Sequence, residues 1–144
     1  MVYLDTSFVA PLVIAEDASD AVEALVLKLK PGELTTSMWT RVELASLVAR
    51  KVRMEQLSAS EAEAVRREFA RILGESFEIL LPAAADYTAA AKYLEIPKTG
   101  LRAGDALHLA IAANYGARKI LTLDKGFADA GKLLKLPVTC GIRT

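Results

Sequence analysis

Four acidic residues that are far apart in the chain stand at positions from which they could form one site: Asp5, Glu43, Asp105 and Asp124. Asp5 ends the apolar segment VYL, and Asp124 ends the apolar segment KILTL. Each segment predicts a buried strand. Ligands of open parallel sheets bind beyond the carboxyl ends of the strands. We therefore expect both aspartates at the same edge of a sheet.

The other two acids lie on predicted helices. Asp105 is in the first turn of a helix expected over residues 103–115, which leads directly into the KILTL segment. Glu43 lies about two turns into a helix expected over residues 38–53, between Val42 and Leu44. These positions place both side chains within reach of the sheet edge that carries the aspartates.

Each acid also has a simpler explanation. Asp5 and Asp124 could each cap the helix that follows, and Asp105 could interact favourably with its helix dipole. Glu43 could face solvent and pair with Arg41 or Arg50. Acids at two strand ends and on two adjacent helices are nevertheless more than capping requires.

A group of carboxylates in one crevice favours a cation site. Like charges raise one another's pKa unless a cation lies between them. The chain has one histidine and one cysteine, so no cluster of nitrogen or sulfur ligands is expected. Oxygen ligands favour Mg²⁺ or Mn²⁺ over zinc. Phosphodiester hydrolysis is the chemistry typical of such sites.

Composition is that of a globular protein. The chain has 144 residues, of which 53% are hydrophobic and 25% charged, and we expect one domain over 1–144. No apolar run reaches the roughly 18 residues of a membrane helix, and no signal peptide is recognised. Cys140 alone excludes an internal disulfide and a thiolate metal site. A cytoplasmic location is predicted.

Charge is unevenly distributed although the net charge is zero. The zero total argues against a protein that holds nucleic acid by bulk attraction alone. Residues 97–144 nevertheless carry eight bases and three acids, a net charge of +5. This third of the chain could present a basic rim around the acidic site, or simply solvated helix faces.

Apolar periodicity predicts alternating strands and helices. This order indicates an α/β fold, a three-layer α/β/α sandwich with a mainly parallel central sheet. A capping box is expected at residues 60–63, a loop at 97–100, and an apolar region over 8–29 that is either core or a groove for a partner. Strands are expected at 2–4, 33–37, 77–81, 119–123 and near 138, and helices at 7–15, 17–30, 38–53, from about 60, 84–94, 103–115 and 126–134.

Four segments, in this order, resemble the PIN-domain family and, within it, the VapC-like toxins of toxin–antitoxin pairs. They are YLDTSFV, TRVELA, LRAGDALHLAIA and ILTLDKGFA, and the match covers essentially the whole chain. The resemblance implies a Mg²⁺- or Mn²⁺-dependent endoribonuclease that acts on RNA. It also implies a homodimer and an antitoxin protein whose tail blocks the site.

The resemblance also assigns roles by motif position. Metal-site and catalytic roles fall on the four acids, and supporting roles fall on the hydroxyls of Thr6, Ser7 and Thr122. Many relatives carry another acid two residues after the fourth acid, where this chain has Gly126. The resemblance therefore supports four acids here and not a fifth.

Three further residues have two explanations each. His108 shares a helix face with Asp105 and could carry a proton or contact phosphate, although a packing or hydrogen-bonding role is favoured. Trp39 could stack on a base, but a core or dimer-face role is favoured. Arg102, next to the Asp105 turn, could hold a substrate phosphate.

Two other functions are consistent with parts of the sequence. A catalytically silent PIN-like module would bind RNA or protein without cutting, although the complete acidic set argues against it. A phosphatase would use Asp5 as a nucleophile, but phosphatases of the haloacid-dehalogenase type carry a second aspartate where this chain has Ser7.

Overall fold

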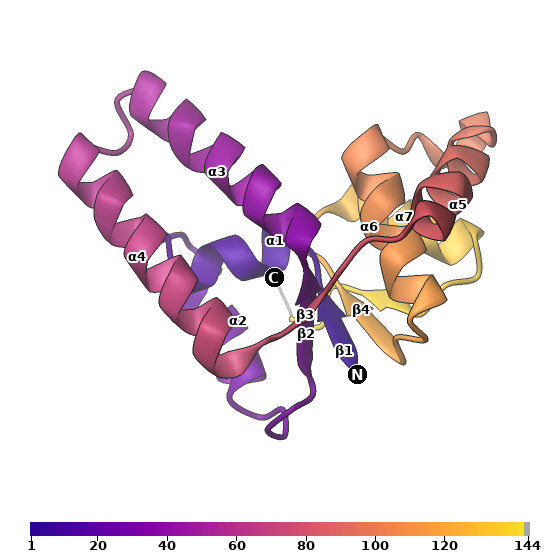
Figure 1. The fold of residues 1–144 in the computed structure, drawn as a ribbon, viewed down its shortest axis with the longest axis horizontal. Coiled ribbons are helices and arrows are strands. Elements are labelled where there is room, and N and C mark those ends of the chain that lie inside the picture. The colour runs from indigo at the N-terminus through magenta and orange to yellow at the C-terminus, as the bar shows by residue number, and fades with distance from the viewer. Residues whose placement is uncertain (143–144) are drawn as a thin grey trace.

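A computed structural model describes residues 1–142 and contains one parallel sheet. Its five strands lie in the order β3-β2-β1-β4-β5, and every neighbouring pair is parallel (Figure 1). The mainly parallel sheet predicted from the sequence is confirmed. The strands are β1 (Val2–Leu4), β2 (Leu34–Ser37), β3 (Glu78–Leu80), β4 (Lys119–Leu121) and β5 (Val138–Thr139).

Helices cover both faces of the sheet, which confirms the three-layer sandwich (Figure 1). One layer contains α1 (Thr6–Val9), the 3-10 helix η1 (Ala10–Leu12), α2 (Ser19–Val26), α3 (Met38–Arg53) and α4 (Ala59–Ser76). The other layer contains α5 (Ala84–Leu94), the 3-10 helix η2 (Pro97–Thr99), α6 (Ala103–Asn114) and α7 (Lys125–Leu133). Within residues 1–142, no helix is both long enough and apolar enough to cross a membrane.

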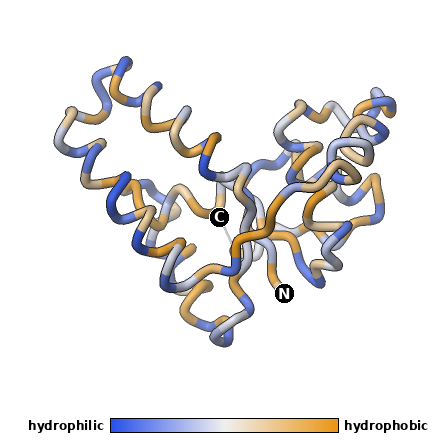
Figure 2. Tube along the Cα trace, viewed as in Figure 1, coloured by the Kyte–Doolittle hydropathy of each residue, from blue (hydrophilic) through white to orange (hydrophobic). Residues whose placement is uncertain are grey.

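Each face of the sheet has its own core because side chains alternate along a strand. Val2 and Leu4 of β1 pack with α1–α4, whereas Tyr3 packs with α5–α7. Ile120 and Leu121 of β4 divide between the two cores in the same way. Figure 2 shows the complementary pattern on the helices, with hydrophilic and hydrophobic residues alternating along α4. The sheet is therefore buried on both sides, as its continuous apolar strands predict.

Three local predictions were wrong in detail. The segment expected as one helix over 7–15 divides into α1 and η1, with Pro11 in the 3-10 turn. The segment at 97–100, expected as a loop, contains η2. The capping box at the start of α4 joins Ser58 and Glu61 and not Ser60 and Glu63, because the Ser58 hydroxyl accepts from the Glu61 amide.

The order of the strands creates a crevice beside β1. From β1 the chain moves outward to β2 and β3, and it later returns to β4 and β5 on the other side of β1. Helices α1–α4 follow the first part and α5–α7 the second, on opposite faces. The carboxyl ends of β1 and β4 therefore form the switch point at which ligands of such sheets bind.

Candidate active site

A cavity of about 400 Å³ lies at this switch point and brings all four predicted acids together. Asp5 and Asp124 follow β1 and β4, while Glu43 comes from α3 on one face and Asp105 from α6 on the other. Polar and charged side chains make up most of the remaining lining. The cavity is also lined by Thr6, Ser7, Ser46, Leu47, Arg50, Arg102, Gly104 and His108.

Asp5 is buried, and uncharged donors hold both of its carboxylate oxygens. Oδ1 accepts from the Ser7 hydroxyl at 2.7 Å and from the Phe8 amide at 3.0 Å, while Oδ2 accepts from the Thr122 hydroxyl at 2.6 Å. Burial raises the pKa of Asp5 above its ordinary value, although the His108 charge and these hydrogen bonds oppose the rise. Asp5 also caps α1, so the capping explanation and membership of the acidic cluster hold together.

The supporting hydroxyls link the two strand ends. Thr122 is fully buried, and its hydroxyl oxygen accepts from the Asp124 amide at 3.1 Å while it donates to Asp5. The Ser7 oxygen accepts from the Leu123 amide at 2.8 Å. The loop after β4 is thus fixed against the loop after β1 through two hydroxyls, both of which the sequence motifs had marked.

Glu43 points into the cavity and forms an ion pair with neither of the predicted arginine partners. Its Oε1 accepts from the Thr6 hydroxyl at 2.7 Å and lies in close contact with Nε2 of His108. Burial raises the pKa of Glu43, but hydrogen bonds from His108 and Thr6 and the charges of His108 and Arg102 outweigh it, so the pKa is lowered overall. The explanation of Glu43 as a solvent-facing partner of Arg41 or Arg50 is wrong.

Arg102 connects the remaining two acids. Its Nε lies 3.3 Å from Oδ2 of Asp105, and an Nη lies 3.2 Å from Oδ2 of Asp124. The Arg102 side chain is 77% exposed, so these ion pairs contribute little stability. Asp124 also caps α7 by accepting from the Phe127 amide at 2.8 Å. Arg102 therefore supplies positive charge between two carboxylates that would otherwise repel each other.

The pKa of Asp105 is raised in this setting. Burial is the largest cause, Arg102 opposes it, and the negative charges of Asp124 and Glu43 raise the pKa further. Asp105 is thus the acid whose protonation depends most visibly on its carboxylate neighbours. A second positive charge in the cavity would favour its ionised form.

Three residues near the cavity were not recognised as partners of the acids from the sequence. His108 was grouped with Asp105, but its ring contacts Glu43, and Tyr3 lies behind it with its hydroxyl 2.7 Å from Nδ1. Gly104 makes room for Glu43, because a Cβ at this position would lie 2.7 Å from Oε2 of Glu43. A glycine directly before an acid in a helix start was the available signal for Gly104.

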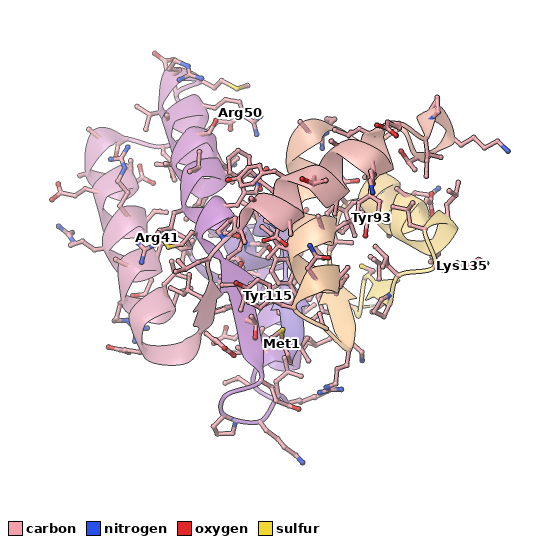
Figure 3. All side chains as sticks on the ribbon, turned by 45° about the vertical axis from the view of Figure 1, so that its right-hand side comes forward. Met1, Arg41, Arg50, Tyr93, Tyr115 and Lys135 are labelled. Carbon is pink, nitrogen blue, oxygen red and sulfur yellow. The ribbon has the colours of Figure 1, made fainter. Side chains whose placement is uncertain are left out.

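The structure also shows where Trp39 and the nearby arginines lie. Trp39 packs against the core on the α5–α7 side, as favoured from the sequence, and among the described residues no partner accepts from its buried Nε1. Arg50 lines the cavity from α3, whereas Arg41 lies on the side of α3 away from it (Figure 3). Of the bases in the C-terminal third, Arg102 lines the cavity, and Arg143 lies outside the described residues.

The donor set of the cavity suits a hard divalent cation. Carboxylate and hydroxyl oxygens line it, and these are the ligands that Mg²⁺ and Mn²⁺ prefer. In the arrangement with Arg102 between Asp105 and Asp124, no three acidic, histidine or cysteine side chains of residues 1–142 converge on one ion-sized position. The residues fit such a cation by chemistry, and Arg102 would have to leave the two aspartates for it.

A larger cavity, of about 510 Å³, lies between α2, α4 and the start of β2. It contains none of the four acids, so its size does not make it the better candidate for chemistry. Leu12, Val26 and Leu29 from the apolar region 8–29 line it, while Phe8 and Val22 of that region are buried core. Part of the region 8–29 is therefore core, and another part lines a cavity that could receive a partner.

Comparisons with known proteins give the family and the fold. A family model described as PIN domain matches residues 2–133. VapC20 of Mycobacterium tuberculosis, titled a sarcin-ricin loop cleaving toxin, is similar with a TM-score of 0.71 at 20% identity, covering 91% of this chain and 95% of that chain. FitAcB from Neisseria gonorrhoeae is similar with a TM-score of 0.71 at 20% identity, covering 98% of both chains.

VapBC-1 from nontypeable Haemophilus influenzae is similar with a TM-score of 0.70 at 20% identity, again covering 98% of both chains. At this level of identity the likenesses establish a shared fold. None of the curated proteins compared with the chain matches its sequence.

Proposed function

The chain belongs to the PIN domain family, as its motifs predict, and on that basis we propose that it is a single-domain, Mg²⁺- or Mn²⁺-dependent endoribonuclease. The observation that carries this proposal is the convergence of Asp5, Glu43, Asp105 and Asp124 on one cavity at the switch point of the sheet. The fold is shared with a toxin titled as cleaving the sarcin-ricin loop, which supports RNA as the substrate class.

The four acids would hold the cation, and neighbouring hydroxyl groups hold two of these acids in position. Ser7 and Thr122 fix both oxygens of Asp5 without neutralising its charge. Thr6 does the same for one oxygen of Glu43. A bound divalent cation lowers the pKa of a water molecule and stabilises charge on the attacking and leaving oxygens. Gly126, where many relatives carry a fifth acid, favours a single well-held ion.

Arg102 would contact the substrate. Arg102 forms ion pairs with Asp105 and Asp124, and a cation held by these two aspartates would free the guanidinium from both. The exposed side chain would then remain at the mouth of the cavity, and guanidinium groups bind phosphate oxygens strongly. We assign it to a phosphate of the RNA backbone next to the cleaved bond.

The toxin role, the antitoxin partner, the homodimer and the cytoplasmic location are part of the same proposal. The 510 Å³ cavity beside Leu12, Val26 and Leu29 is the groove we assign to an antitoxin segment. The cytoplasmic location rests on the single cysteine.

RNA cleavage by an aspartate variant tests the enzymatic proposal. We expect the parent protein to cut RNA with Mg²⁺ or Mn²⁺, and Asp5→Asn to lower the rate by more than about 1,000-fold, because a charged ligand is lost. Asp129→Asn, an exposed position on α7, is the matched control and should retain parent activity. Equal rates for Asp5→Asn and the parent would contradict the proposal, and RNA binding without cleavage would favour the silent module.

A further inference from the structure

A buried chain of hydrogen bonds runs from the sheet to the Glu43 carboxylate. Tyr3 on β1 donates its hydroxyl proton to Ser37 at 2.9 Å, and its oxygen lies 2.7 Å from Nδ1 of His108. The other ring nitrogen of His108 contacts Oε1 of Glu43 and lies 3.1 Å from the Thr6 hydroxyl. The Tyr3 proton is directed to Ser37 and a carboxylate oxygen only accepts, so both ring nitrogens of His108 act as donors in this network, Nδ1 to Tyr3 and Nε2 to Glu43.

The chain is more than a packing contact. Tyr3 and Ser37 are fully buried and His108 is 1% exposed, so neither nitrogen of the ring can exchange its partner for bulk water. Tyr3 and Phe127 also pack edge-on against the ring, with centroids 5.8 and 6.5 Å away. Two hydrogen-bonded nitrogens and two aromatic neighbours leave the ring one orientation, in which Nε2 faces Glu43.

We propose that His108 is a positioning residue that holds the Glu43 carboxylate at the cavity, and that Tyr3 in turn holds His108. The role rests on the proposed function, since it concerns how Glu43 is presented to a cation. Glu43 lies on α3 and His108 on α6, so the contact also joins the two helical layers across the switch point. Outer partners of this kind fix the orientation of a ligand and are typically worth ten- to a hundredfold in affinity or activity.

Tyr3→Phe isolates this role because it removes the hydroxyl and keeps the packed ring. We expect Mn²⁺ affinity, measured by calorimetry, and kcat for RNA cleavage each to fall about tenfold, with KM for RNA unchanged. Tyr115→Phe is the matched control: it also removes a hydroxyl that donates at 2.8 Å, here to the Leu81 carbonyl on an exposed surface. It should leave all three quantities at parent values.

The single histidine of the chain provides a direct readout. Its ¹⁵N resonances belong to His108 without assignment, and we expect Tyr3→Phe to shift the Nδ1 signal and Mg²⁺ to perturb the Nε2 signal of the parent. His108→Gln, which keeps an N–H donor, should recover part of the Mn²⁺ affinity that His108→Leu loses. Both comparisons report on orientation, which a role in packing alone would not affect.

The outcomes separate this inference from the proposed function. A parent protein that binds no Mn²⁺ and cuts no RNA would overturn the proposed function and, with it, the role of His108. An active parent whose Tyr3→Phe variant matches Tyr115→Phe in Mn²⁺ affinity and kcat would overturn only the positioning role. If His108→Leu does not fold, the Tyr3→Phe comparison decides alone.

Discussion

Two pairs of carboxylates share the cavity but are held by different means. Asp5 and Glu43, the core-held pair, are fixed by side chains that belong to the sheet and the buried layers, such as Thr122 and His108. Asp105 and Asp124, the arginine-held pair, share one exposed cation, Arg102.

The difference separates permanent from exchangeable contacts. Uncharged donors fix both oxygens of Asp5 and leave its negative charge available, whereas a guanidinium neutralises the charge that it holds. Under the proposed function, the core-held pair would therefore stay in place with or without a cation. The arginine-held pair would exchange Arg102 for the cation.

The largest expected effect concerns the core-held pair and the stability of the cation-free protein. Burial raises the pKa of Asp5 above its ordinary value of 3.8, so between the two values the folded state holds a proton that the unfolded state has released. The free energy of unfolding therefore falls as the pH rises through this window. Asparagine carries no such ionisation, so Asp5→Asn should raise the melting temperature of the cation-free protein at pH 7 by about 3 °C or more.

The same substitution should lower cation affinity by more than about 100-fold, so that Mg²⁺ no longer raises the melting temperature as it does in the parent. Asp124→Asn provides the contrast in the arginine-held pair, since asparagine caps a helix as well as aspartate and the cation-free stability should hardly change. Thermal unfolding at pH 5 and pH 7, with and without Mg²⁺, measures both. A cation-free Asp5→Asn protein that is less stable than the parent at pH 7 would contradict the argument.

A second prediction uses glycines to displace one carboxylate from each pair. A Cβ on Gly104 would lie 2.7 Å from Oε2 of Glu43, whereas a Cβ on Gly126 would lie 3.2 Å from Oδ1 of Asp124. Glu43 is fixed and cannot yield without losing its hydrogen bonds, so Gly104→Ala should lower kcat about 10- to 100-fold. Gly126→Ala should lower it no more than about threefold, because a contact at 3.2 Å requires Asp124 to shift by only a few tenths of an ångström.

The control for both is Gly74→Ala on α4, where a Cβ meets nothing within 4 Å. Single-turnover cleavage rates at saturating Mg²⁺ provide the measurement. Equal losses in the two site variants would remove the distinction between the pairs.

Much of the sheet and of the site could be predicted from the sequence, and what could not be predicted has a physical reason. The apolar strands predicted the sheet, and strand ends located Asp5 and Asp124 because a parallel sheet gathers its carboxyl ends at one edge. These features are local, or follow from topology alone. The hydroxyls of Ser7 and Thr122 were assigned instead by the resemblance of their motifs to the PIN-domain family.

The partners of Glu43 could not be found in this way. His108 is 65 residues from Glu43 in the chain, and Tyr3 is 105 residues from His108. Such contacts depend on how two helical layers meet across the sheet, which periodicity does not encode. The nearest arginines on the same helix were therefore the natural but wrong choice of partner for Glu43.

The spacing of a capping box fits two pairs of residues at the start of α4. Ser58 with Glu61 and Ser60 with Glu63 both fit the spacing of a capping box, and the structure uses the first pair. Local spacing alone does not choose between the two pairs.

The smallest expected effect concerns Arg102 and is a change of opposite sign in two affinities. Arg102 would compete with a cation for Asp105 and Asp124, so Arg102→Gln should raise Mn²⁺ affinity about three- to tenfold. The same substitution removes the proposed phosphate contact, so it should raise KM for RNA by a similar factor. Arg118→Gln, which breaks an arginine–carboxylate pair with Glu33 outside the cavity, should change neither quantity. Calorimetry with Mn²⁺ and steady-state cleavage measure the two effects separately. A lower Mn²⁺ affinity in Arg102→Gln would mean that the guanidinium organises the two aspartates for the cation and does not compete with it. The proposed exchange of Arg102 for a cation, which distinguishes the arginine-held pair from the core-held pair, would then be wrong.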